Sequence, residues 1–94
     1  MSEEFTLDKF KYFLECYFNP SMDYSDITDL AEEYRKDESV LNIKKFLYEL
    51  LEIKNKEQWN AANIVIKEHG MRNLNQEQIK QMVNSLIRVL NRSW

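Results

Sequence analysis

The sequence has little of the material from which tight turns, disulfides and metal sites are made. Its 94 residues include one glycine, one proline, one cysteine and one histidine. An all-β fold needs many turns that contain glycine and proline, so their scarcity argues against that class. The same scarcity excludes a glycine-rich phosphate-binding loop. The single cysteine, Cys16, cannot form an internal disulfide, so nothing in the sequence points to an oxidising compartment.

Long hydrophobic runs are also missing. No apolar stretch approaches the ~20 residues that a helix needs to cross a bilayer. The N-terminal residues MSEEF have neither the basic residues nor the apolar run of about 7–15 residues that a secretory signal contains. We therefore expect a cytoplasmic protein. A hydrophobic content of 44% is typical of a chain with a real core, and the length favours one domain over residues 1–94.

The spacing of the apolar residues predicts an all-α fold, a compact bundle of about five short helices. The first predicted helix covers residues ~6–18, where six apolar side chains follow helical spacing. It ends at Asn19-Pro20-Ser21, because the residue before a proline is pushed out of the α region.

The second and third predicted helices each begin after a capping residue. Ser25 or Asp26 can cap the second helix, which ends near Asp37, and Ser39 can cap the third. The apolar residues of the third helix are Val40, Ile43, Phe46, Leu47, Leu50 and Leu51.

The fourth and fifth predicted helices begin at patterns that resemble capping boxes, Asn55 with Gln58 and Asn75 with Gln78. Gly70 is expected to end the fourth helix in the left-handed conformation that glycine adopts freely. The apolar residues of the fourth helix are Trp59, Ala62, Ile64, Val65 and Ile66, and those of the fifth are Ile79, Met82, Val83, Leu86, Ile87 and Leu90.

The net charge of −3 hides an uneven distribution. Residues 1–38 hold eleven acidic and four basic residues, a net charge of −7. Residues 39–94 hold five acidic and nine basic residues, a net charge of +4. Seven carboxylates fall within residues 19–38 alone, so the acidic charge is concentrated around the second predicted helix.

Apolar and acidic residues occupy separate faces of this second helix. On a helical wheel that starts from Asp26, the apolar side chains fall between about 40° and 140°, and the acidic ones between about 240° and 20°. The apolar residues are Ile27, Leu30, Ala31 and Tyr34. The acidic residues are Asp26, Asp29, Glu32, Glu33 and Asp37, with Asp23 and Tyr24 in the loop before them.

The residues alone leave two interpretations of this acidic face open. A run of charge is usually a solvated helix face, and acids near a helix N-terminus gain from the helix dipole. Alternatively, the face is a docking surface for a basic partner, because clustered charge raises association rates and a tyrosine such as Tyr24 can anchor an interface. Like charges at i,i+4 cost a few tenths of a kcal/mol each, so the face is mildly unfavourable without a use.

The residue types that carry catalysis and hold cofactors are scarce, so we expect no enzyme, no cofactor and no metal site. Asp23, Asp26 and Asp29 recur every third residue, but a calcium loop needs alternating oxygen ligands and a turn glycine, which are missing here. His69 is expected to interact with the dipole at the end of the fourth helix. Cys16 is expected to lie at the edge of the core, since no histidine is near it in sequence to activate it.

Direct binding to nucleic acid or to a membrane is not expected either. The basic residues of the second half are spread over three predicted helices, and the sequence pI is about 5.2. A nucleic-acid-binding domain usually has a basic stripe and a high pI. No predicted helix combines dense Lys and Arg with exposed aromatic residues, as a helix on a membrane surface would.

A pattern in the first half of the chain resembles a known family. The opening helix ends in Phe-Leu-x-x-Tyr-Phe, a loop aspartate follows, and a Leu-rich segment with a glutamate comes later. The matching residues are Phe13, Leu14, Tyr17, Phe18, Asp23, Leu47, Glu49, Leu50 and Leu51. In these features the chain resembles the small helical immunity proteins of bacterial contact-dependent growth inhibition systems. Beside the loop aspartate it has Met22 and Tyr24 in place of the tryptophan expected from the family pattern.

This resemblance implies a function. Such immunity proteins protect the producing cell by binding the toxic C-terminal domain of a large secreted protein, and many of these toxins are nucleases, often RNases. A nuclease active site is basic because it must hold a phosphate backbone. The implied mechanism is a 1:1 complex in which acidic side chains take the place of phosphates, or cover a neighbouring exosite, and Tyr24 anchors the contact. The residues implied in toxin binding are Asp23, Tyr24, Asp26, Asp29, Glu32, Glu33 and Asp37.

A function of another class also fits the residues. The chain could serve as a small helical adaptor or regulatory module that associates with itself through an exposed aromatic patch. A specific complex with a toxin domain separates the two alternatives, as does a toxin gene directly upstream.

Overall fold

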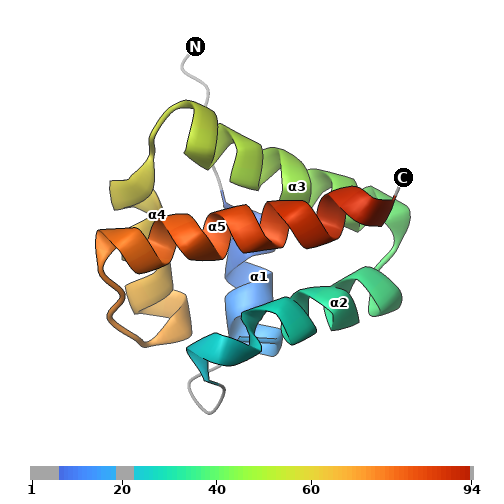
Figure 1. Ribbon diagram of the computed structural model, residues 1–94, viewed down its shortest axis with the longest axis horizontal. Helices are drawn as coiled ribbons and strands as arrows, with labels where there is room; N and C mark the ends of the chain where they lie inside the picture. The colour runs from blue at the N-terminus through green and yellow to red at the C-terminus, as the bar shows by residue number, and fades with distance from the viewer. Residues whose placement is uncertain (1–6, 19–22, 94) are drawn as a thin grey trace.

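The computed structural model describes residues 7–18 and 23–93, and it confirms the all-α class (Figure 1). Its α-helices are α1 (Asp8–Cys16), α2 (Ile27–Asp37), α3 (Val40–Asn55), α4 (Trp59–Val65) and α5 (Gln76–Leu90). The short elements are the 3-10 turns η1 (Tyr24–Asp26) and η3 (Asn91–Ser93) and the π-helical turn η2 (Ile66–Gly70). No strand occurs within the described residues. The predicted stop at Asn19-Pro20-Ser21 lies outside them, as does the predicted helix start near residue 6.

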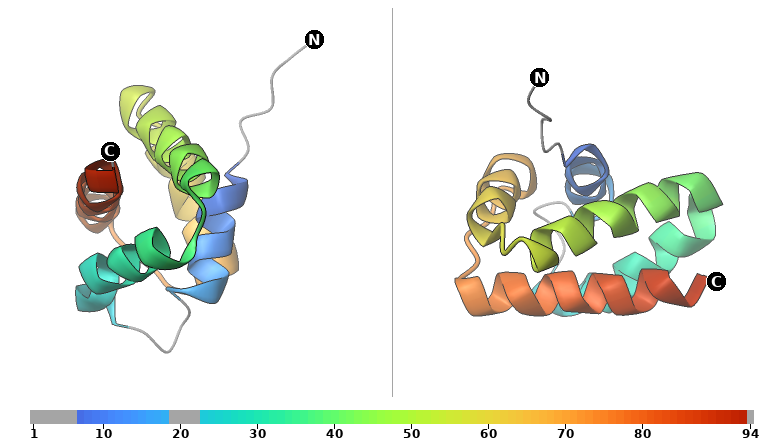
Figure 2. Two further views of the ribbon diagram at one scale, coloured as in Figure 1. Left: turned by 90° about the vertical axis from the view of Figure 1, so that its right-hand side faces the viewer. Right: turned by 90° about the horizontal axis from the view of Figure 1, so that it is seen from above.

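α5 forms the centre of the front face and packs against α2 on one side and α3 on the other (Figure 1). α1 lies behind these helices, where it packs against α3 and η2. α4 closes one end of the molecule against α3 and α5. The two further views in Figure 2 show that α2 and α3 stay on different sides of α5. Their outward faces are therefore available on different sides of the molecule.

The core next to α1 is aromatic. Phe10, Phe13, Tyr34 and Phe46 are fully buried, and the ring of Phe46 lies 5.3 Å from that of Phe13 and 5.0 Å from that of Tyr34. Such ring pairs add about 0.5–1.5 kcal/mol each beyond the area that they bury. The aliphatic residues that α5 contributes to the core are Ile79, Met82, Val83, Leu86, Val89 and Leu90.

The N-terminus of α1 is capped by a residue from another helix. Leu7 stands at the N-cap position of α1 and has no capping side chain. Instead, the buried carboxylate of Glu49 on α3 accepts hydrogen bonds from the backbone N–H groups of Lys9 (3.0 Å) and Phe10 (2.9 Å). Burial raises the pKa of Glu49, and these two hydrogen bonds act against that rise. A helix leaves its first N–H groups without partners inside the helix, and the Glu49 carboxylate supplies those acceptors for α1. It thereby fixes the N-terminus of α1 against α3.

The predicted caps of α3 and α5 are confirmed. The side chain of Ser39 accepts a hydrogen bond from the backbone N–H of Asn42 at 3.2 Å. Asn75 and Gln78 form the predicted capping box, in which each side chain accepts a hydrogen bond from the other residue's backbone N–H. Both caps involve residues three positions apart, so the local sequence contains the whole interaction.

The predicted start of the fourth helix at Asn55 is wrong. α3 continues through Asn55, and α4 begins at Trp59 with Gln58 as its N-cap residue, without a side-chain capping bond. Ile53 near the end of α3 is fully buried. Packing against the core therefore keeps the last turn of α3 helical. The pattern of Asn55 with Gln58 cannot start a new helix there, because Asn55 is still part of α3.

Gly70 ends the fourth helical segment, but by a mechanism other than the predicted one. Gly70 has no positive φ, and the left-handed residue is Met71, with a φ of 54°. A Cβ atom at position 70 would lie 3.3 Å from a methyl carbon of Leu14, so the missing side chain lets η2 approach α1 closely. His69 lies at this same end, as expected, and its Nδ1 contacts a carboxylate oxygen of Glu15.

Four residues that were predicted to lie on apolar faces or at the edge of the core are exposed instead. They are Cys16, Val40, Leu51 and Ile64. A helix face is covered only where another element packs against it, and a wheel does not show where that packing ends. Val40 is the first residue of α3, and Ile64 lies near the end of α4.

Candidate functional site

α2 separates its apolar and acidic residues as the helical wheel predicts. Its buried residues are Ile27, Leu30, Ala31 and Tyr34. On the outward face, Asp29, Glu33 and Asp37 are exposed and follow one another at intervals of four residues, or about 6 Å along the helix axis. We call these three residues the α2 acidic stripe. None of the three forms an ion pair with another described residue.

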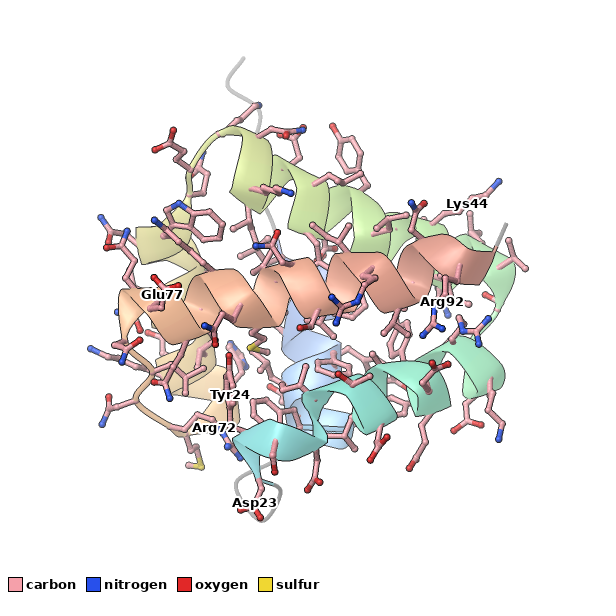
Figure 3. The ribbon with its side chains drawn as sticks, viewed as in Figure 1. Asp23, Tyr24, Lys44, Arg72, Glu77 and Arg92 are labelled. Carbon is pink, nitrogen blue, oxygen red and sulfur yellow. The ribbon has the colours of Figure 1, made fainter. Side chains whose placement is uncertain are left out.

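Glu32 lies on the flank of α2 that faces the end of α5, and its charge is compensated within the chain. Arg35 donates to one oxygen of its carboxylate at 2.8 Å, and Arg92 of η3 donates to the other. The hydrogen bond from Arg35 is the main cause that lowers the pKa of Glu32, and Arg92 adds to it. Figure 3 shows Arg92 beside α2. Glu32 therefore ties η3 to α2 and offers little net charge to a partner.

Asp23 and Asp26 form the turn that leads into α2. The backbone N–H of Asp23 donates to the carboxylate of Asp26 at 3.3 Å, and the N–H of Asp26 donates to the carbonyl of Asp23 at 2.9 Å. The predicted cap of α2 by Ser25 or Asp26 is wrong, because Asp26 stands at the N-cap position but its side chain forms no capping hydrogen bond to that helix. Asp23 is exposed and Asp26 is half-buried, so Asp23 extends the acidic surface beyond the start of the helix.

Tyr24 extends from η1 toward α5 rather than away from the molecule (Figure 3). Its hydroxyl donates to the backbone carbonyl of Gln78 at 2.7 Å. Burial raises the pKa of Tyr24, and the negative charge of Glu77 adds to this effect. The ring is half-buried, so its remaining exposed part could contact a partner while its hydroxyl stays bound within the chain. The role of Tyr24 as an anchor stays a prediction.

Sequence reasoning missed a different role for the last carboxylate of the acidic segment, Glu38. One oxygen of Glu38 accepts hydrogen bonds from the hydroxyls of Tyr12 (2.9 Å) and Tyr17 (2.8 Å), and the other accepts from Asn42 (3.2 Å). Burial acts to raise the pKa of Glu38, but the hydrogen bonds from Tyr17, Tyr12 and Asn42 together lower it. The tyrosines lie 26 and 21 residues away in sequence, so no local pattern could show the link.

The predicted binding residues therefore fall into two groups. Asp23 and the α2 acidic stripe are exposed along η1 and α2, whereas Tyr24, Asp26 and Glu32 are half-buried and take part in contacts within the chain. The exposed group can present four negative charges to a basic surface. Its side chains are carboxylates alone, so what it offers chemically is charge and hydrogen-bond acceptance.

Within residues 7–18 and 23–93, no helix is long and apolar enough to cross a membrane. Nor do three or more His, Cys, Asp or Glu side chains come together there as the ligands of a metal ion would.

Comparison of the chain with protein-family models, with curated proteins and with solved structures found no match.

Proposed function

We propose that this chain is a bacterial immunity protein, a non-enzymatic cytoplasmic protein that inhibits the toxin of a contact-dependent growth inhibition system. Its partner is the C-terminal toxin domain of a large secreted protein, a nuclease that acts on RNA. The chain binds this domain in a 1:1 complex and covers the basic region around its active site.

One observation carries the proposal: four of the exposed carboxylates follow one another along η1 and α2, and three of them, Asp29, Glu33 and Asp37, form no ion pair with another described residue. Asp29, Glu33 and Asp37 line the outward face of α2, and Asp23 continues the surface at η1. By contrast, Arg35 and Arg92 hold the charge of Glu32 within the chain. Carboxylates that repel one another on one face destabilise the free helix slightly, and a basic partner removes that repulsion.

The same charge distribution supports a mechanism. A nuclease groove attracts phosphate through Lys and Arg, so a row of carboxylates is attracted to it by the same field. Steered association of this kind can reach about 10⁸ M⁻¹s⁻¹ at low salt and falls steeply as salt rises. An interface of standard size buries about 1,600 Å² in total, so residues beyond the acidic ones must contribute. The exposed edge of Tyr24 and the first turns of α2 lie beside the α2 acidic stripe, so they are candidates for this additional contact.

The test is co-expression of the tagged chain with the toxin domain encoded directly upstream of its gene. We expect the two to purify as one 1:1 complex and the cells to survive. The decisive variant is Asp29→Lys with Glu33→Lys. We expect it to lower the association rate at low salt at least about tenfold and to flatten the salt dependence, because it reverses two charges of the stripe.

A charge-matched control makes the result specific to the stripe. Glu57→Lys with Glu68→Lys changes the net charge by the same amount at exposed positions outside α2, and we expect it to keep the affinity. If both double variants weaken binding equally, net charge rather than the stripe is responsible. If no complex forms with the native chain and the toxin stays lethal, the immunity function is wrong, and the adaptor function becomes the better explanation.

A further inference from the structure

α3 exposes more large hydrophobic residues than any other described helix, although exposed Lys44, Lys45 and Asn55 lie among them. Val40, Leu41, Tyr48 and Leu51 are exposed large hydrophobic residues of this one helix, and Tyr48 is 64% exposed. Leu41 and Tyr48 are two turns apart and lie on one side of α3, with Lys44 between them. We call Leu41, Lys44, Tyr48, Leu51 and Glu52 the α3 stripe. Several large hydrophobic residues exposed on one helix are more typical of an interface than of a solvated surface.

We propose that two copies of this chain associate through the α3 stripe as a symmetric dimer, with the two α3 helices antiparallel and the two-fold axis at Tyr48. In this arrangement, the residue n positions before Tyr48 in one copy faces the residue n positions after Tyr48 in the other copy. The two Tyr48 rings meet at the axis, where an aromatic pair contributes beyond its buried area.

Charge complementarity selects this arrangement. Lys44 is four residues before Tyr48 and Glu52 is four residues after it, so each Lys44 faces the Glu52 of the other copy. The symmetry forms this pair twice. A parallel arrangement would instead place Lys44 against Lys44 and Glu52 against Glu52, which is repulsive. Antiparallel helices also bring opposite ends of their dipoles together.

The contacts of Glu52 within the chain leave room for this pair. Lys56 donates to one oxygen of the Glu52 carboxylate at 2.9 Å, and a carboxylate has two oxygens that can each accept hydrogen bonds. Lys44 projects outward from α3 in Figure 3. The α3 stripe therefore presents Tyr48 at its centre, with the positive charge of Lys44 on one side of it and the negative charge of Glu52 on the other.

The position of α3 in the fold permits the dimer and the proposed toxin complex at the same time. α3 and α2 lie on different sides of α5, so a partner on the α3 stripe leaves the α2 acidic stripe exposed (Figure 1). A helix of 16 residues is about 24 Å long, and two such helices bury an area at the small end of specific interfaces. We therefore expect a micromolar dissociation constant, of the order of 10–100 µM.

Sedimentation equilibrium of the chain without toxin, from about 1 µM to about 1 mM, tests the proposal. We expect a monomer–dimer equilibrium. Lys44→Glu alone and Glu52→Lys alone should each weaken the dimer about tenfold or more, because each creates two like-charge pairs. Lys44→Glu and Glu52→Lys combined in one chain should restore the dimer. An equimolar mixture of the two single variants should form a heterodimer of native strength for the same reason.

Matched controls test the register and the apolar part. Lys45→Glu combined with Glu52→Lys should not restore the dimer, because position 45 faces position 51 across the axis. Tyr48→Ser should abolish the dimer, and Ile64→Ser, a change at an exposed apolar residue of α4, should not. Circular dichroism confirms that each variant is folded.

Several outcomes would overturn the proposal. A native chain that stays monomeric at about 1 mM excludes the dimer. A dimer that the combined charge swap fails to restore excludes the antiparallel register. If the double variant Asp29→Lys with Glu33→Lys disrupts the dimer, the α2 acidic stripe of one copy contacts another face of the second copy. That result excludes a dimer through the α3 stripe. Toxin binding is measured separately, by the co-expression test, so failure of the dimer and failure of the immunity function are distinguishable.

Discussion

At the contact between α1 and α3, the carboxylate of Glu49 is buried and accepts two backbone hydrogen bonds. Along the outward face of α2, by contrast, the carboxylates of Asp29, Glu33 and Asp37 are exposed and have no ion-pair partner among the described residues. The same chemical group is a structural connection in the first region and surface charge in the second. Glu38 follows the acidic helix in sequence but belongs to the first kind, because Tyr12 and Tyr17 bind it. The role of a carboxylate in this chain therefore depends on its partners and not on its position in an acidic segment.

The largest effect that we expect from separating these two kinds of carboxylate is at Glu49. Glu49→Ala leaves the N–H groups of Lys9 and Phe10 without their acceptor at the N-terminus of α1. We expect the free energy of unfolding to fall by about 2–4 kcal/mol, because each unsatisfied buried donor costs about 1–3 kcal/mol. Urea unfolding measures this loss. Glu52→Ala, on the same helix, is the control and should cost less than about 0.5 kcal/mol. Equal losses for the two variants would contradict the capping role of Glu49.

Removing a tyrosine hydroxyl near Glu38 should have an intermediate effect on stability. Tyr17→Phe removes a hydrogen bond to the Glu38 carboxylate and should lower the free energy of unfolding by about 1–2 kcal/mol. The Tyr34 hydroxyl is buried without a hydrogen-bond partner among the described residues, so Tyr34→Phe should leave stability unchanged or raise it by up to about 1 kcal/mol. Equilibrium unfolding of both variants is the measurement, and a large loss in Tyr34→Phe would show that its hydroxyl does have a partner.

The pH dependence of stability should have opposite signs at Glu38 and Glu49. The pKa of Glu38 is lowered from 4.5 in the folded chain, so its contribution is present above pH 4.5 and is lost as the pH falls through the folded-state pKa. The pKa of Glu49 is raised above 4.5, so the folded chain binds that proton more tightly than the unfolded chain does. Protonation of Glu49 therefore adds to stability as the pH falls toward 4.5.

Urea unfolding between pH 7 and pH 3 measures both signs against Gln variants. The stability difference between the native chain and Glu38→Gln should shrink as the pH falls below 4.5. The difference between the native chain and Glu49→Gln should grow as the pH falls from 7 to 4.5. If both differences change in the same direction, the two carboxylates are not distinguished by their surroundings.

The smallest effect on stability is expected at the α2 acidic stripe. Asp29→Asn with Glu33→Gln removes the repulsion between two carboxylates four residues apart, but it also removes the favourable interaction of Asp29 with the dipole at the start of α2. Because the two effects oppose each other, the free energy of unfolding should change by less than about 0.5 kcal/mol. The melting temperature of the free chain is the measurement. A destabilisation of more than about 1 kcal/mol would show that these carboxylates belong to the structural kind after all.

Local interactions made much of this structure predictable. The cap at Ser39 and the capping box of Asn75 with Gln78 involve residues three positions apart, and both are confirmed. The burial of Tyr34 follows from its place on the apolar side of the α2 wheel. Predictions from equally local patterns were wrong where packing opposed them. Buried Ile53 keeps α3 helical past the expected cap at Asn55.

Within the candidate site, sequence reasoning predicted the outward position of Asp29, Glu33 and Asp37 because a helix of known phase determines it. It could not predict that Arg92 compensates Glu32, a contact across 60 residues. Nor could it predict that the hydroxyl of Tyr24 binds the carbonyl of Gln78, 54 residues away.

What the sequence determined by itself is the helical class, the separation of apolar from acidic residues on α2, and two helix starts, because these depend on periodicity and on contacts within about one turn. Tertiary structure alone decided which carboxylates are used inside the fold and which remain outside. Glu49 lies 40 residues from Lys9, and Gly70 is needed where it meets Leu14 rather than for a left-handed turn. The physical reason is that burial and hydrogen bonding depend on which surfaces meet, and separate helices meet only when the core forms.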